Sequence, residues 1–117
     1  MRNTIKKHDD FLVGPDDFNA RCAMFFIRAR PARFGDDARY GLIVTKKTFK
    51  LAVDRNRAKR MLRDWIRFNE NQMCNELDYV FIARRPLLFS GRTDGRTAMK
   101  KALHYIKRTY EKSRKKK

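Results

Sequence analysis

The sequence predicts one α+β domain in which helices pack against a single layer of β-sheet. Its 117 residues suffice for one domain with one modest core. Apolar patterns follow the order helix, strands, helix, strand, helix without an internal repeat, so residues 1–117 are expected to form a single unit. The stretch from Gly41 to Ala83 reads strand–helix–strand, which predicts two parallel strands joined by a helical crossover.

A short helix is predicted within residues 1–12. The residues that recur there at helical spacing are Ile5, His8, Phe11 and Leu12. Gly14-Pro15 would end this helix, because neither residue continues helical geometry well. Asp16-Asp17 then indicates a turn or a helix cap.

Three strands are predicted from short apolar runs. Residues 22–29, CAMFFIRA, form the first, which Pro31 closes, and residues 41–45, GLIVT, form the second. Residues 78–83, DYVFIA, form the third. Alternation along the first strand places Phe25 on the face opposite to Phe26 and Arg28.

Two longer helices complete the expected order of elements. The first begins between Leu51 and Arg55 and runs to about Met73, with Asp54 as a cap or first-turn acid. After a loop at residues 90–95, the second runs from about Thr97 to Lys112. Its predicted apolar side consists of Ala98, Ala102, Leu103, Tyr105, Ile106 and Tyr110. The basic tail at 112–117 is expected to be solvated and frayed.

The charge balance restricts the class of partner. The chain has 30 Lys and Arg against 13 Asp and Glu, a net charge of +17. An excess of this size favours nucleic acid or an anionic membrane surface, with acidic proteins third. Because no apolar stretch approaches the roughly 20 residues that span a bilayer, nucleic acid is favoured. The N-terminus lacks a secretion signal and Cys22 and Cys74 form no disulfide framework, which fits a reducing cytoplasm.

The segment 55–67, RNRAKRMLRDWIR, combines a cationic and an apolar helix face. At about 100° per residue, one side carries Asn56, Lys59, Arg60, Arg63 and Arg67, with Arg55 at its edge. The opposite side carries Ala58, Met61, Leu62, Trp65 and Ile66. The first side suits phosphate oxygens and the second can bury against a sheet. The alternative is a solvated face with ion pairs such as Asp64 with Arg60 or Arg67.

Signs of catalysis by the chain itself are weak. His8 and His104 are isolated, and no metal-ligand spacing or glycine-rich phosphate loop occurs. Asp9-Asp10, Asp16-Asp17 and Asp36-Asp37 are more typical of helix caps and turns than of a metal site. We therefore expect no catalytic residue and no metal ligand in this chain.

Several motifs together resemble the bacterial ribonuclease P protein subunit. Residues 55–63, RNRAKRMLR, are similar to the RNR motif of that family. Residues 41–47, GLIVTKK, resemble the family's strand that ends in paired lysines, and residues 78–84, DYVFIAR, resemble its later strand. Ala52-Val53 and residues 6–11 also match. The resemblance covers roughly residues 5–110, and it departs from the family at 48–51, where a glycine usually occurs.

The resemblance implies a fold and a function. The fold would be a two-layer αβββαβα arrangement with a left-handed βαβ crossover, also found in a domain of a ribosomal protein. The protein would join ribonuclease P RNA one to one, itself a monomer, and assist removal of the 5′ leader from precursor tRNA. The RNA subunit would carry the chemistry and the magnesium, so the protein would bind no cofactor and no membrane. The rival interpretations are a non-enzymatic ribosomal or RNA-assembly protein and a peripheral membrane protein.

The resemblance and the chemistry of the side chains together suggest two sites. The residues expected to bind the RNA subunit are Arg55, Asn56, Arg57, Lys59, Arg60, Arg63 and Arg67. Arg57 lies off the main basic side, so a structural role stays open. The residues expected to bind the leader in a cleft are Phe11, Phe26 and Arg28, with Lys46 and Lys47 at the rim. Phe26 fits cleft and core equally well, whereas Phe25 and Trp65 are assigned to the core.

Overall fold

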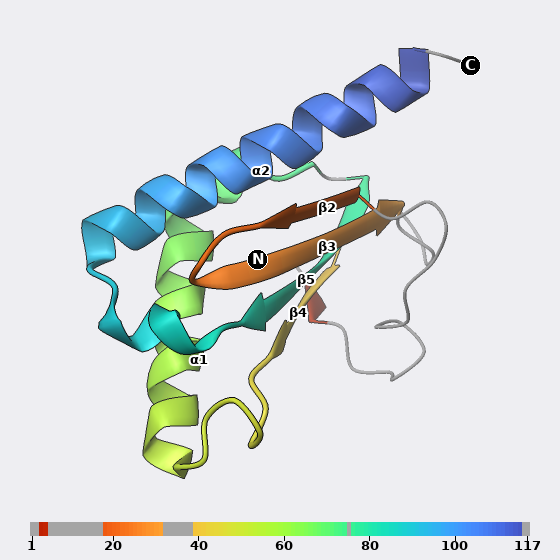
Figure 1. Cartoon of the computed structure of the whole chain (residues 1–117). Coiled ribbons are helices and arrows are strands. Elements are labelled where there is room, and N and C mark those ends of the chain that lie inside the picture. The colour runs from red at the N-terminus through yellow and green to blue at the C-terminus, as the bar shows by residue number, and fades with distance from the viewer. Residues whose placement is uncertain (1–2, 5–17, 32–38, 75, 116–117) are drawn as a thin grey trace.

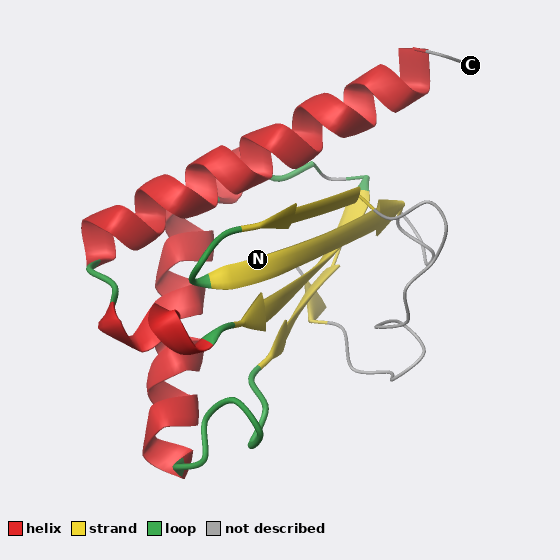
Figure 2. Cartoon of the chain, viewed as in Figure 1, coloured by secondary structure: helices red, strands yellow, loops and turns green. Residues whose placement is uncertain are grey.

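The computed structural model describes residues 3–4, 18–31, 39–74 and 76–115. They form a mixed β-sheet with two long helices, α1 (Ala52–Phe68) and α2 (Arg92–Lys115), which Figures 1 and 2 show beside the strands. Both helices contribute to one continuous apolar cluster with one face of the sheet. The predicted α+β architecture is therefore confirmed.

The sheet has five strands in the order β1-β4-β5-β3-β2. Their bounds are β1 Asn3–Thr4, β2 Phe18–Arg21, β3 Phe25–Pro31, β4 Arg39–Ile43 and β5 Leu77–Ala83. The central strand β5 pairs parallel with β4 and antiparallel with β3. The predicted parallel pair joined by a helix is thus β4–α1–β5, and this prediction is confirmed.

The N-terminal part of the sheet differs from the prediction. The strand expected at 22–29 is β3, and the preceding residues form β2, which pairs antiparallel with β3. The apolar runs did not locate β2, although the αβββαβα order implied by the resemblance includes three strands before the long helix. The hairpin turn is held from outside, because Arg84 donates from its backbone N–H to the Met24 carbonyl and from Nη1 to the Cys22 carbonyl, both at 3.0 Å. Cys22, in this turn, is half-buried and packs against the edge of the core.

Predictions for the first segment are tested only in part. Asn3 and Thr4 lie in a strand that pairs parallel with β4, so the expected helix does not extend over them. The rest of that helix, including Phe11, and the acidic pairs Asp9-Asp10, Asp16-Asp17 and Asp36-Asp37 lie outside the described residues.

Helix α1 begins where predicted but ends earlier than Met73. Asn69 ends it by supplying competing hydrogen bonds: its side-chain Nδ2 donates to the Trp65 carbonyl at 3.0 Å and to the Arg96 carbonyl at 2.9 Å. A short 3₁₀ turn, Glu70–Gln72, follows. Asp54 lies in the first turn, where the positive end of the helix dipole stabilises its negative charge.

Helix α2 is longer than predicted, because Gly95 was interpreted as part of a loop. In the structure, the backbone of this glycine lies against the indole of Trp65, and a Cβ at this position would lie only 2.0 Å from Cε2 of Trp65. The missing side chain thus lets the two helices meet. The helix also continues through Lys115, so most of the expected frayed tail is helical.

The core is formed by residues from every layer. Phe25, Ile27 and Ala29 of β3 are buried, while Phe26, Arg28 and Arg30 between them are only partly buried, as the strand alternation predicted. Trp65 is 1% exposed and Phe25 is fully buried, so both core assignments are confirmed. On α2 the buried residues are Met99, Leu103 and Ile106. Tyr105, which was assigned to the apolar side, is 58% exposed.

Candidate nucleic-acid interface

The basic face of α1 is the first candidate surface, and it consists of Asn56, Lys59, Arg60, Arg63 and Arg67. All are exposed except Lys59, which is half-buried. The opposite side of the helix is buried through Ala58, Leu62, Trp65 and Ile66. The helix therefore fixes a row of cations at regular spacing on a packed scaffold, which suits binding to phosphate oxygens.

Arg55 has a different position from the rest of the motif. Its Nη1 donates hydrogen bonds to the backbone carbonyls of Phe49, at 2.9 Å, and Lys50, at 3.0 Å. Phe49 is itself buried. Arg55 thus fastens the loop that leads into α1, and a structural contribution of this motif residue was not foreseen from the sequence.

Arg57 lies beside the basic face and lines a polar hollow of about 380 Å³. The hollow is lined by Arg57, Arg60, Met61, Asp64, Trp65 and Arg92. Arg92, at the start of α2, was not among the predicted site residues because the sequence placed it in a loop. Three arginines from two helices therefore line one recess, and such a cluster of guanidinium groups suits an anion such as a phosphate group.

Asp64 lines this hollow without neutralising the basic face. Its carboxylate accepts two hydrogen bonds from Arg96 of α2, from Nη2 at 3.0 Å and from Nε at 3.1 Å. This pairing holds the pKa of the Asp64 carboxyl below its usual value, with the Arg96 hydrogen bond as the main cause and the charges of Arg92 and Arg67 adding to it. The ion pairs of the alternative interpretation, from Asp64 to Arg60 or Arg67, are not formed among the described residues, and the partner of Asp64 is instead Arg96 on the other helix.

The second candidate surface is the sheet face opposite the helices, which we call the outer face. Phe26 lies on it, and the guanidinium groups of Arg28 and Arg21 lie 4.9 Å and 5.2 Å from the centre of its ring. Phe26 is half-buried, so its position is intermediate between the cleft and the core assignments that the sequence left open. Its ring remains accessible and has two guanidinium groups close to it. Arg21 was missed because the apolar runs did not locate β2 at residues 18–21.

Lys46 and Lys47 are exposed in the loop after β4. The register aligns Ile43, Ile82 and Phe26 across three strands, so the loop leaves the sheet at the end where Phe26 lies. Within this loop the backbone N–H of Thr48 donates to Oγ1 of Thr45 at 3.2 Å. The two lysines thus flank the end of the outer face. Phe11, the remaining predicted leader-binding residue, lies outside the described residues.

Three further observations concern the part of the chain that the structure describes. No group of three or more His, Cys, Asp or Glu side chains in it is placed to hold a metal ion. Neither α1 nor α2 has an apolar stretch that would reach across a bilayer. His104 is exposed on α2.

Comparison with known proteins adds a family. The family model described as Ribonuclease P matches residues 2–107. The ribonuclease P protein component of Halalkalibacterium halodurans is 40% identical over 83 residues, which are 70% of this chain and 69% of that protein. The corresponding protein of Pseudomonas entomophila is 52% identical over 52 residues, which are 44% of this chain and only 38% of that protein.

A solved structure shows the same fold. The ribonuclease P protein of Thermotoga maritima superimposes with a TM-score of 0.72 over 88% of this chain and 96% of that chain, at 22% sequence identity. Its identity is too low to carry more than the fold, whereas the family match extends over most of the sequence. From that match we conclude that this chain belongs to the ribonuclease P protein family.

Proposed function

We propose that the chain acts as the protein subunit of ribonuclease P. It would bind the RNA subunit and the 5′ leader of precursor tRNA and thereby assist endonucleolytic removal of the leader in the cytoplasm. The RNA subunit would carry the chemistry and hold the catalytic magnesium ions. Membership of the family supports this proposal, and the arrangement of α1 supports the assignment of the RNA-binding surface.

The observation that carries the proposal is the division of α1 into two faces. Leu62 and Trp65 are buried, whereas Arg60 and Arg63, on the other side of the same helix, are exposed. A rigid row of this kind can neutralise several phosphates at once and release their counterions. We assign the contact with the RNA subunit to Asn56, Arg57, Lys59, Arg60, Arg63 and Arg67, with Arg55 holding the loop at their edge.

The outer face of the sheet is the proposed leader-binding surface. Single-stranded RNA binds where an accessible aromatic ring can stack on a base and nearby cations follow the backbone. Phe26 offers such a ring, with Arg21 and Arg28 beside it and Lys46 and Lys47 beyond the strand end. We propose that Phe11 also contributes to leader binding and that the chain binds one RNA subunit as a monomer.

Reconstitution with a bacterial ribonuclease P RNA tests the proposal. The chain alone should leave precursor tRNA intact, and adding it to the RNA at low magnesium should produce the mature 5′ end. Absence of both binding and enhancement of cleavage would contradict the proposed function.

A matched pair of arginine variants tests the surface. Arg63→Ala should weaken binding to the RNA subunit and lower the slope of log affinity against log salt by about one, because one phosphate contact is lost. Arg85→Ala removes the same charge from an exposed position in the 3₁₀ turn Arg85–Phe89 and should leave both quantities nearly unchanged. Equal effects of the two variants would mean that binding follows total charge and not the basic face of α1.

A further inference from the structure

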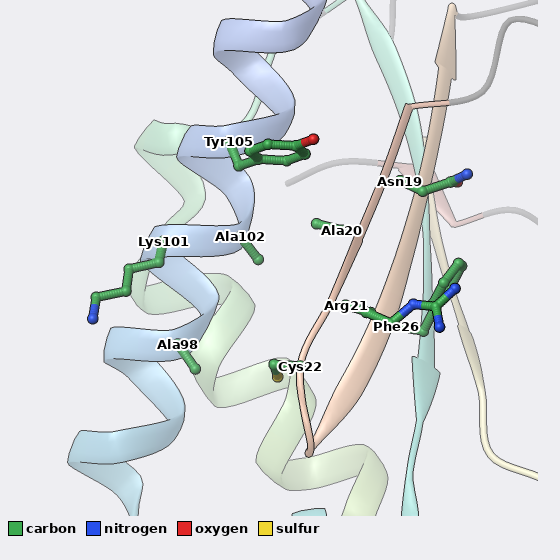
Figure 3. A pocket seen from close by; sticks show the side chains of 9 residues that line it. All are labelled: Asn19, Ala20, Arg21, Cys22, Phe26, Ala98, Lys101, Ala102 and Tyr105. Carbon is green, nitrogen blue, oxygen red and sulfur yellow. The ribbon is translucent and has the colours of Figure 1, made fainter.

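A groove of about 640 Å³ lies between β2 and α2, away from the basic face of α1. Figure 3 shows small side chains between the two elements, namely Ala20, Cys22, Ala98 and Ala102. The ring of Tyr105 projects from α2 toward β2, while Lys101 and Arg21 extend outward on opposite sides. The groove thus has an apolar floor, one aromatic wall and a cation at each rim.

The strand beside the groove has an open edge. β2 is the last strand of the sheet, and the backbone N–H of Cys22 donates to the Phe25 carbonyl at 2.9 Å. Since hydrogen-bonding residues alternate along an antiparallel pair, Ala20 also bonds toward β3, and Asn19 and Arg21 direct their N–H and C=O groups away from it. These backbone groups supply donors and acceptors along the groove.

Helix α2 carries further exposed cations beyond the end of the groove. Lys101, Tyr105, Arg108 and Lys112 are exposed and recur at spacings of three and four residues, so they form one stripe along α2. No acidic residue lines the groove. An aromatic ring within a cationic stripe favours a polyanion that also has flat, stackable groups, which is the chemistry of single-stranded nucleic acid.

We propose that this groove binds a segment of single-stranded RNA, with a base stacked on Tyr105 and flanking phosphates at Lys101 and Arg21. Arg21 and Phe26 line the groove and also lie on the outer face, so one strand of RNA can run from that face around β2 into the groove. If the outer face binds the leader, as the proposed function states, the RNA in the groove is the part of the leader that lies farther from the cleavage site.

Leader length provides the test in the reconstituted complex. Precursor tRNAs with leaders of about 4 and about 14 nucleotides would be compared for binding. Tyr105→Ala should weaken binding of the long-leader substrate about tenfold, the effect of losing one stacked base, and leave the short-leader substrate unchanged. Tyr105→Phe keeps the ring and should bind both substrates like the unaltered protein.

A matched pair of lysine variants separates the groove from general charge. Lys101→Ala should weaken binding of the long-leader substrate, whereas Lys100→Ala, an exposed neighbour outside the groove, should have little effect. Equal losses for the two variants, or for the two leader lengths, would overturn the proposal.

A direct measurement keeps this test independent of the proposed function. The full chain alone would be mixed with a fluorescent 12-nucleotide oligouridine carrying photoreactive 4-thiouridine. Crosslinks at or next to Tyr105 are expected, and they should disappear in Tyr105→Ala. Crosslinks confined to α1 and the outer face would overturn the groove assignment, as would binding of an acidic peptide there that the RNA cannot displace. Failure of the complex to cleave precursor tRNA would instead count against the proposed function.

Discussion

Gly95→Ala should destabilise the protein although alanine is the better helix former. In an exposed helix the change would stabilise by about 1 kcal/mol. Here the added Cβ would lie 2.0 Å, 2.1 Å and 2.5 Å from Cε2, Cζ2 and Cδ2 of Trp65. The indole would have to move by about 1.4 Å to restore a van der Waals contact of 3.4 Å.

The indole has no room for such a shift. Trp65 is 1% exposed and its ring centre lies 6.2 Å from that of Phe25, so movement must displace α1 from the sheet. Overpacking of a well-filled core costs about 3 kcal/mol at the upper end of its usual range, so the net loss should be about 2 kcal/mol. The melting temperature should fall by about 8 °C.

Chemical and thermal denaturation of four variants (Gly95→Ala, Gly91→Ala, Trp65→Phe and the double variant Trp65→Phe/Gly95→Ala) would check this reasoning. Gly91→Ala is the control, because nothing lies within 4 Å of a Cβ at that position, and it should change stability by less than about 1 kcal/mol. In a Trp65→Phe background, which lacks the second ring, Gly95→Ala should cost about 2 kcal/mol less than in the unaltered protein. Strictly additive effects, or a stabilising Gly95→Ala, would refute the account.

Two further predictions concern the contacts between the helices. Asp64→Asn should lower stability by under about 1 kcal/mol at neutral pH, since the pair with Arg96 is partly exposed. Because pairing with Arg96 lowers the pKa of Asp64 in the folded state, the stabilisation by this pair is present above the usual pKa of 3.8 and is lost as the pH falls below that value. Urea melts of the unaltered protein and of Asp64→Asn should therefore converge in acid. A difference in stability between the two that stays constant with pH would contradict the assignment. Asn69→Ala should cost about 1–3 kcal/mol, because the buried amide bonds two carbonyls, whereas exposed Asn71→Ala should be nearly neutral in the same melts; equal losses would disprove the capping role.

The sequence predicted the elements whose residues show a clear period. The helix containing residues 55–67 has separate apolar and basic sides, and the short apolar runs at 41–45 and 78–83 lie within or next to β4 and β5. The basic face of α1 could be read directly from this spacing. These features depend on local pattern, which is what a sequence displays.

The errors arise where a distant contact decides the local structure. Gly95 indicates a loop by itself, but the ring of Trp65 makes it the residue that fits within a helix. Asn69 ends α1 partly by donating a hydrogen bond to the Arg96 carbonyl of the other helix. Arg96 also forms the ion pair with Asp64 that the sequence would assign to arginines on α1 itself. β2 is only four residues long and depends on pairing with β3. The groove beside it was therefore beyond prediction, because its two walls are about 80 positions apart in the chain.

The position of β5 at the centre of the sheet has a consequence for how the chain acquires its structure during translation. β3 and β4 are synthesised early but do not pair with each other; each pairs with β5, which ends only at Ala83. Until those residues leave the ribosome, the strands lack their common partner and the apolar side of α1 has no complete surface to cover. We therefore expect the nascent chain to remain open until this late strand is inserted, and to depend on it for the cooperative step.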